Sequence, residues 1–243
     1  MRDDPHTPGG LVGRLRRARA SGRVTNFELF FDLVYVFAFT QVSHLMADSH
    51  SAFGTLQALI VLALMWWTWA AFGWLGNQAP ADEPIMRVGM GVAMVAVFVA
   101  ALTIPEAYED LPGGWYGPIV LVIAYTVVRI IHATLYLIAA GEDAALRRQV
   151  LVTQAVAMVP AVAALLVGVF VGGSWQTWIW LAAWLYDAAL TYASSRGGGS
   201  WRVRSSAPWA ERYGLVVILA LGESIVAIGG GVAPEPLAGA LVV

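Results

Sequence analysis

Long apolar segments alternate with short polar ones along almost the whole chain. Each apolar segment is close to the roughly 20 residues that a helix needs to cross the hydrocarbon core of a bilayer. The pattern therefore predicts an all-α fold, a polytopic transmembrane helical bundle with seven complete spans. We place these spans at 26–46, 54–75, 87–104, 117–139, 150–171, 175–194 and 211–230.

A further apolar segment begins near Pro236 and reaches Val243 after only eight residues. Because a helix this short cannot cross the bilayer, we interpret it as the start of an eighth span. We therefore expect the sequence to be a C-terminally truncated part of a longer protein.

The composition is typical of a membrane protein. Hydrophobic residues make up 59% of the chain and charged residues 12%, about half the charged share of a soluble domain. The net charge of −2 gives no basic field for nucleic acid, and the absence of cysteine excludes disulfides and thiol catalysis. The lipid bilayer is thus the first partner that we expect.

All 14 basic residues are arginines, and their positions predict the orientation of the spans. The loops 47–53, 105–114, 172–174 and 231–235 contain no arginine. An excess of basic residues marks the cytoplasmic side, so we expect a multi-pass protein of the plasma membrane with a cytoplasmic N-terminus. The cytoplasmic side then holds the arginine-rich segment 1–23, which we expect to be a disordered tail. It also holds Arg87, Arg147, Arg148, Arg196, Arg202, Arg204 and Arg212.

The first predicted span carries acidic residues that hydrocarbon should exclude. At about 100° per residue, Glu28 and Asp32 share one helix face with Tyr35 and Ser43. An acid at membrane depth costs at least about 2.5 kcal/mol, so that face should look into the bundle.

Two later spans place ionisable residues in similar stripes. Arg129 and His132 lie near the middle of the fourth span, and Asp187 lies in the inner half of the sixth. The seventh span brings Glu223 and Ser224 to mid-membrane. Since Arg129 is the only deep cation apart from His132 in this interpretation, we expect it to contact Asp187, Glu223 or Asp32.

The charges of these groups do not cancel in this interpretation. Three ionised acids, Asp32, Asp187 and Glu223, face one arginine, which leaves two negative charges in excess. A low-dielectric bundle cannot hold that excess. Protonation, a bound cation or a charged His132 would neutralise it, and this predicts a proton or small cation at the site.

Tryptophan is concentrated in the second span, at Trp66, Trp67, Trp69 and Trp74. Aromatic residues gather at the membrane interface, so we interpret the run as an interfacial belt together with packing residues.

The segments around 31 and 213 can be aligned, with Leu33, Val34 and Ala38 against Leu215, Val216 and Ala220. This predicts a parallel repeat of six-span units. The first unit would cover 24–208, and 209–243 would begin an incomplete second unit.

The same two segments resemble a known family. ELFFDLVYVFA at 28–38 and ERYGLVVILALGESIVAIG at 211–229 are similar to motifs of the bacterial low temperature requirement protein A family, as is the tryptophan run followed by Asn77. The resemblance implies a polytopic membrane protein linked by name to growth in the cold. One departure is that Pro208 and Trp209 stand where the family often has a histidine.

Two functions remain open at this point. The first is a proton- or cation-linked transporter or channel for a small solute, with Glu28, Asp32, Arg129, His132, Asp187, Glu223 and Ser224 as binding or ion-relay candidates. The second is a non-transporting membrane-integrity or scaffold protein in cold or stress adaptation, whose polar residues only lock helices together. No phosphate loop, nucleophile elbow or metal-ligand spacing is present, so we expect no enzymatic activity, metal or cofactor. The sequence does not predict an oligomeric state.

Overall fold

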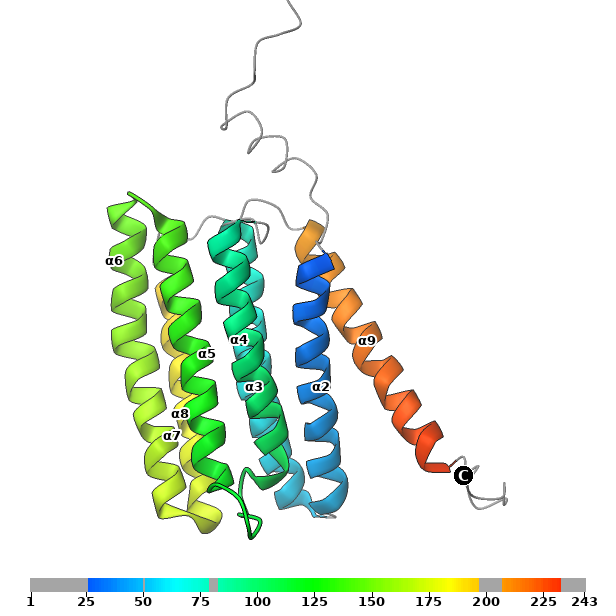
Figure 1. The fold of residues 1–243 in the computed structure, drawn as a ribbon. Coiled ribbons are helices and arrows are strands. Elements are labelled where there is room, and N and C mark those ends of the chain that lie inside the picture. Colours follow the sequence, from blue (N-terminus) through cyan, green and yellow to red (C-terminus); the bar gives the residue numbers. More distant parts are fainter. Residues whose placement is uncertain (1–25, 50, 79–82, 197–206, 233–243) are drawn as a thin grey trace, which may run out of the picture.

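The computed structural model describes residues 26–49, 51–78, 83–196 and 207–232. The tail 1–23 and the predicted eighth segment lie outside these ranges. Every regular element within them is helical, and the helices lie side by side along one axis (Figure 1). In chain order they are α2 (Asn26–Ser49), α3 (Ala52–Gln78), α4 (Pro84–Thr103), the 3-10 turn η1 (Ile104–Glu106), α5 (Gly117–Ala140), α6 (Ala144–Thr153), the π turn η2 (Gln154–Met158), α7 (Val159–Val171), α8 (Gly173–Arg196) and α9 (Ala207–Val232).

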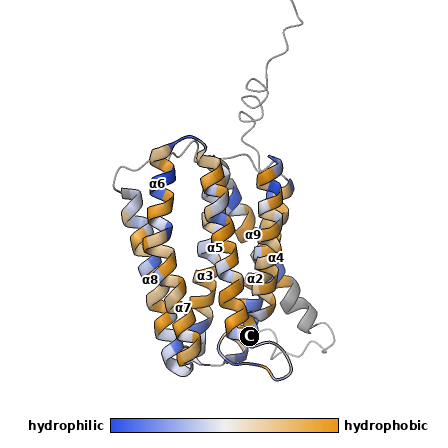
Figure 2. Ribbon diagram, turned by 60° about the vertical axis from the view of Figure 1, so that its left-hand side comes forward, coloured by the Kyte–Doolittle hydropathy of each residue, from blue (hydrophilic) through white to orange (hydrophobic). Residues whose placement is uncertain are grey.

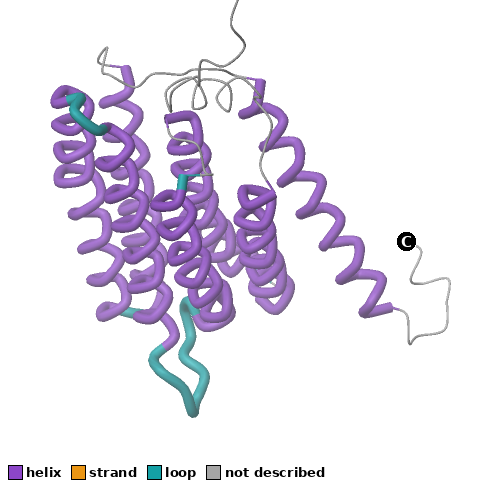
Figure 3. The backbone as a smooth tube through the Cα atoms, turned by 45° about the horizontal axis from the view of Figure 1, so that its top comes forward, coloured by secondary structure: helices purple, strands orange, loops and turns teal. Residues whose placement is uncertain are grey.

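Successive helices run in opposite directions, with α6, η2 and α7 forming one continuous helix (Figure 1). As a result, the loop 141–143 lies at one end of the bundle, together with the last residues of α3 and α8 and the first residues of α4 and α9. The loop 107–116 extends from the other end (Figure 3). This alternation matches the loop sides predicted from the arginines.

The all-helical prediction is confirmed, but seven spans are not. Among the described residues, five helices are long and apolar enough to cross a membrane: 26–49, 52–76, 84–106, 117–140 and 144–171. The helix α8 is as long but more polar, because it contains Gln176, Thr177 and Asp187, and only part of α9 has described side chains. Figure 2 shows the same contrast between the hydrophobic α7 and the more mixed α8.

The polar residues at the start of α8 are buried because they bond to neighbouring helices. Gln176 Nε2 donates to the carbonyl oxygen of Ala107 at 2.8 Å, and Gln57 Nε2 donates to Thr177 Oγ1 at 3.0 Å. Both α8 side chains are at most 1% exposed. The low hydropathy of α8 therefore reflects hydrogen bonds inside the bundle.

The π turn before α7 has a local cause in the sequence. Pro160 has no backbone N–H, so it cannot bond the carbonyl oxygen of Val156 four residues earlier. The Tyr186 hydroxyl of α8 donates to that oxygen at 2.9 Å. A side chain of the neighbouring helix thus supplies the hydrogen bond that Pro160 cannot donate at η2. In other proteins, π turns often mark functional positions.

The final helix, α9, packs against the rest of the bundle through its first turns. Figure 1 shows that α9 begins beside the start of α2, runs in the same direction, and then diverges from it. The buried residues in the described part of α9 are Arg212 and Val216, both near its beginning. The parallel direction is the one that the predicted repeat requires, but a repeat of six-span units is not confirmed.

Candidate functional site

A buried ion pair joins α5 and α8 at the middle of the bundle. Arg129 Nη1 donates to Asp187 Oδ2 at 2.5 Å, and Nη2 donates to Oδ1 at 3.3 Å. The side chains are only 7% and 2% exposed, respectively. The predicted pairing of Arg129 with a deep carboxylate is therefore confirmed, with Asp187 as the partner.

Two further side chains fix this pair. The Trp67 indole on α3 donates from Nε1 to Asp187 Oδ2 at 2.8 Å. Arg129 Nη1 also donates to the Tyr125 hydroxyl, one turn earlier on α5, at 2.9 Å. Hydrogen bonds to charged groups are stronger than neutral ones, so these contacts reduce the cost of holding the ions away from water.

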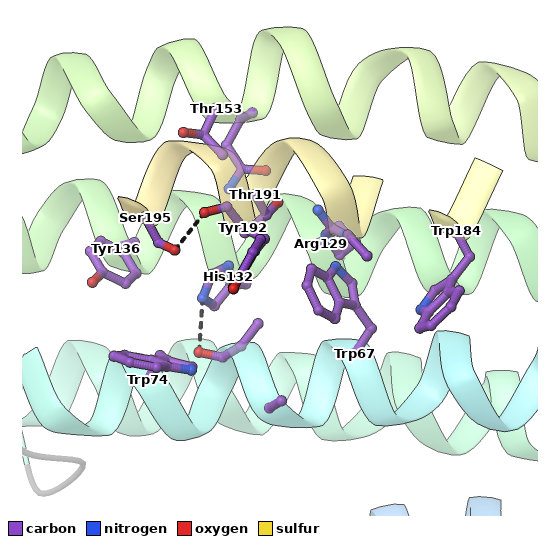
Figure 4. Close-up of a pocket in the computed structure, with 14 residues that line it drawn as sticks. Trp67, Trp74, Arg129, His132, Tyr136, Thr153, Trp184, Thr191, Tyr192 and Ser195 are labelled. Atoms are coloured by element: carbon purple, nitrogen blue, oxygen red, sulfur yellow. Dashed lines mark hydrogen bonds between the residues drawn. The ribbon is translucent and has the colours of Figure 1, made fainter. Parts of the chain in front are cut away.

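A cavity of about 480 Å³ begins beside this pair. It lies between α3, α5, α8 and the α6–η2 segment and runs toward the end of the bundle that holds the 141–143 loop. Figure 4 shows Arg129 and Trp184 at one end, Tyr136 and Ser195 at the other, and His132 between them. Its lining residues are Trp67, Ala70, Ala71, Trp74, Arg129, His132, Tyr136, Thr153, Gln154, Trp184, Ala188, Thr191, Tyr192 and Ser195.

The polarity of the cavity changes along its length. The deep end has indole rings and the Arg129 guanidinium, whereas the outer end has the hydroxyl groups of Thr153, Thr191 and Ser195. His132 lies between these ends, and its Nε2 is 3.1 Å from the carbonyl oxygen of Ala71 on α3. The cavity thus combines an apolar wall with a small set of polar groups, which is typical of a small-molecule site.

Three lining residues hold buried polar atoms that have no hydrogen-bond partner among the described residues. They are Arg129 Nε, Trp184 Nε1 and Gln154 Oε1. A buried donor or acceptor without a partner costs about 1–3 kcal/mol. Such atoms gathered around one cavity favour a ligand that supplies the missing partners.

A second buried ion pair lies at the opposite side of α3. Arg212, on α9, donates from Nη2 to Asp32 Oδ1 at 2.7 Å and from Nε to Oδ1 and Oδ2 at 3.1 and 3.0 Å. Asp32 is fully buried and Arg212 is 5% exposed. The contact fixes the start of α9 against α2.

Aromatic rings and a second carboxylate enclose this pair. Trp69 Nε1 donates to Asp32 Oδ1 at 2.8 Å, and the rings of Phe31 and Trp69 lie about 6 Å from the guanidinium carbon. Glu28 Oε1 is 3.8 Å from Arg212 Nη1. A Cβ added at Gly76 on α3 would come within 3.2 Å of that same carboxylate oxygen, so the glycine permits close packing here.

The tryptophan run on α3 connects the two ion pairs. Trp67 donates to Asp187 and Trp69 to Asp32. Two residues span about 200° on a helix, so these indoles leave opposite sides of α3. The sequence interpretation, an interfacial belt with packing residues, missed both hydrogen bonds. The two-residue spacing of Trp67 and Trp69 was a signal for them, because it places the indoles on opposite sides of the helix.

The predicted excess of negative charge is wrong for the described residues. The sequence interpretation counted Arg212 on the cytoplasmic side, at the very start of the span 211–230, whereas α9 begins at Ala207 and carries Arg212 into the bundle as the partner of Asp32. Each deep aspartate therefore has its own arginine. Glu223 lies on the exposed part of α9, away from both pairs, and the Ser224 side chain lies outside the described residues.

The candidate residues do not form one central site. Asp32 and Glu28 belong to the α2–α9 pair, whereas Arg129, His132 and Asp187 belong to the cavity region. The structure also brings in Trp67, Trp184 and Gln154, which the sequence interpretation did not place at a site. Within the described part of the chain, no group of three or more histidine, aspartate or glutamate side chains could hold a metal ion.

Comparisons with known proteins place the chain in a family. Residues 23–243 match the model of a family described as bacterial low temperature requirement A protein. An uncharacterized protein of Rhizobium meliloti (strain 1021) is 25% identical over 214 residues, which cover 83% of this chain and 49% of that protein. The chain thus spans about half the length of the curated relative that it matches. No solved structure matches it. With nearly its full length matched, the chain belongs to the bacterial low temperature requirement A family, a family of membrane proteins.

Proposed function

We propose that this protein is a proton-linked membrane transporter of a small solute and that the cavity beside Arg129 is its solute site. The observation that carries the proposal is that a cavity of about 480 Å³ reaches a buried ion pair. Ligand sites commonly measure about 300–1,000 Å³, with mostly apolar walls and a few polar groups. Ionisable groups at this depth are costly, and they mark solute and proton pathways in membrane proteins.

His132 is the proton carrier in this proposal. It lines the cavity between the ion pair and the outer hydroxyl groups, and an imidazole can accept a proton at one ring nitrogen and donate one from the other. Among the described residues, the hydrogen-bond contact of its ring is the Ala71 carbonyl oxygen. No chemical step on the solute is proposed, and no resident cofactor is required.

The proposal includes a topology. We infer that α8 and α9 also cross the plasma membrane, that the N-terminus is cytoplasmic, and that the cavity runs toward the cytoplasmic side. Cysteines introduced at Ser51 and Gly113 should then react with impermeant thiol reagents added to intact cells, whereas one at Gly198 should not. Labelling at Gly198 from outside would contradict this orientation.

The transport proposal is testable in liposomes that contain a pH-sensitive dye. Gradients of sodium, potassium, or small organic anions and cations should move protons faster with protein than without it for at least one solute. His132→Gln should abolish this increase, while Trp178→Phe should not, because Trp178 is an exposed indole of α8 outside the cavity. Size-exclusion profiles of both variants serve as folding controls.

A scaffold function is the second candidate, and the Asp32–Arg212 pair favours it. This pair is enclosed, densely bonded, and outside the cavity lining, as expected for residues that only lock helices. If no gradient gives protein-dependent proton movement, the scaffold function replaces transport. If His132→Gln moves protons at the wild-type rate, transport stands and the role of His132 is wrong.

A further inference from the structure

The charge that faces the cavity indicates what kind of ligand it accepts. Arg129 is among the lining residues, whereas its partner Asp187 is not. The fourteen lining residues include no aspartate or glutamate. A cation in this cavity would therefore meet a guanidinium without a facing carboxylate, which disfavours cationic ligands.

The geometry of the guanidinium leaves one edge for an anion. Nη1 and Nη2 point toward Asp187, and Nη1 also bonds Tyr125. Nε has no hydrogen-bond partner in the described structure. A guanidinium has five N–H donors in a fixed plane, so a second carboxylate can bind along the edge that contains Nε.

A second donor lies at the same end of the cavity. The indole Nε1 of Trp184 is buried and has no partner among the described residues, and Figure 4 shows Trp184 at the same end as Arg129. Two unpartnered donors match the two oxygen atoms of a carboxylate. Both atoms are covered in this structure, so ligand entry requires a small movement of these side chains.

The walls indicate the rest of the ligand. Trp67, Trp74 and Trp184, with Tyr136 and Tyr192, surround the space. Aromatic side chains pack well against a flat apolar ring, through offset or edge-to-face contacts. Inorganic phosphate or sulfate would leave these surfaces without apolar contact.

We propose that the cavity binds a small organic acid in its carboxylate form, with an aromatic body between the indole rings and the carboxylate at Arg129 Nε and Trp184 Nε1. This inference rests on the proposed function, because it takes the cavity as the solute site. It replaces the small cation expected from the sequence by an anion. When the anion of a weak acid crosses the membrane together with one proton, no net charge is transferred.

Isothermal titration calorimetry on the full chain in phosphatidylcholine nanodiscs tests the ligand class. The probes are benzoate, benzamide and benzylammonium, which share a ring and differ in charge, and octanoate, which has a carboxylate on an aliphatic chain. Benzoate should bind roughly tenfold or more tightly than benzamide, as expected for a charge-assisted hydrogen bond, and benzylammonium should bind least. Equal binding of the three ring compounds, preference for benzylammonium, or no binding at all would overturn the proposal.

Two matched variants locate the binding. Trp184→Phe keeps an aromatic ring but removes the N–H donor, so it should weaken benzoate binding by roughly three- to tenfold without changing benzamide binding to the same degree. Trp178→Phe, on the exposed side of the same helix, should leave both unchanged. Unchanged benzoate affinity in Trp184→Phe would contradict this carboxylate position, and octanoate binding more tightly than benzoate would contradict the aromatic body.

The outcomes of the binding and transport tests distinguish failure of the ligand proposal from failure of the transport proposal. Selective benzoate binding without any protein-dependent proton movement would overturn the transport proposal and leave the ligand class standing. Proton movement driven by sodium or potassium, with no preference for carboxylates in calorimetry, would overturn the ligand class and leave transport standing.

Discussion

The two buried ion pairs contain the same chemical groups in different surroundings. In each, an arginine from one helix meets an aspartate from another, and an indole of α3 donates to the aspartate. The Arg129–Asp187 pair adjoins a cavity of about 480 Å³, and Arg129 Nε has no partner. The Arg212–Asp32 pair has three hydrogen bonds between arginine and aspartate, against two in the other pair, and lies outside that cavity.

The difference separates two uses of a buried charge. A buried pair with complete bonding and no adjoining space resists removal of either partner, because a single charge would remain in a low-dielectric interior. A pair beside a cavity can exchange one contact for a ligand or for water. We therefore assign helix locking to Arg212–Asp32 and solute binding to Arg129–Asp187, and six single substitutions test this division.

The largest effect on stability should come from Asp32→Asn. The change removes the carboxylate that Arg212 bonds directly and leaves only Glu28 Oε1 at 3.8 Å, so it costs about 3–5 kcal/mol in the free energy of unfolding. Unfolding in mixed micelles titrated with sodium dodecyl sulfate measures this value. The double variant Asp32→Asn with Arg212→Met should recover part of the loss, because it removes the unpaired charge.

Asp187→Asn should have a smaller effect, about 2 kcal/mol. The remaining Arg129 keeps its hydrogen bond to Tyr125 and lines a cavity, where water can hydrate the guanidinium or an anion can bind it. The same unfolding measurement compares the two aspartates. If Asp187→Asn lowers the free energy of unfolding as much as Asp32→Asn or more, the cavity does not stabilise the unpaired arginine. The contrast between the two pairs would then be wrong.

A deep carboxylate partner for Arg129 could be predicted from the sequence, with Asp187 as one of three candidates beside Glu223 and Asp32. A mid-span arginine needs a partner, and Asp187 lay at a compatible depth on another predicted helix. Helix positions were also predictable, since apolar length and polar interruptions are local properties. The predicted span 117–139, for example, corresponds to α5 at Gly117–Ala140.

The second pair was missed because it depends on where α9 begins. The positive-inside pattern favours an arginine on the cytoplasmic side, and Arg212 was counted there on that basis, at the start of the predicted span 211–230. In the structure, α9 begins five residues before Arg212, and packing against α2 buries that residue. The environment of Glu223 was equally unpredictable, because it depends on which helix packs against α9 rather than on its own sequence.

The indole donors offer a third comparison between the two pairs. Trp69→Phe removes the N–H that bonds Asp32 and should cost about 1.5–2 kcal/mol, within the range for hydrogen bonds to charged groups. Trp67→Phe removes the equivalent bond to Asp187 and should cost less, because the cavity that Trp67 lines has room for a substitute donor. Thermal unfolding of both variants in detergent gives the order, and the reverse order would contradict the assigned difference in enclosure.

The smallest effect concerns the space next to the enclosed pair. A Cβ at Gly76 would lie 3.2 Å from Glu28 Oε1 and 3.7 Å from Arg212 Nη1, whereas a Cβ at Gly91 on α4 meets nothing within 4 Å. Alanine normally stabilises a helix interior by up to about 1 kcal/mol relative to glycine, and Gly91→Ala should show this gain. In Gly76→Ala the close contact should cancel it and leave a net loss of up to about 1 kcal/mol. The free energies of unfolding of the two variants measure the difference directly. An equal gain in stability at both positions would mean that the Arg212–Asp32 region has space for an added methyl group and is not tightly enclosed.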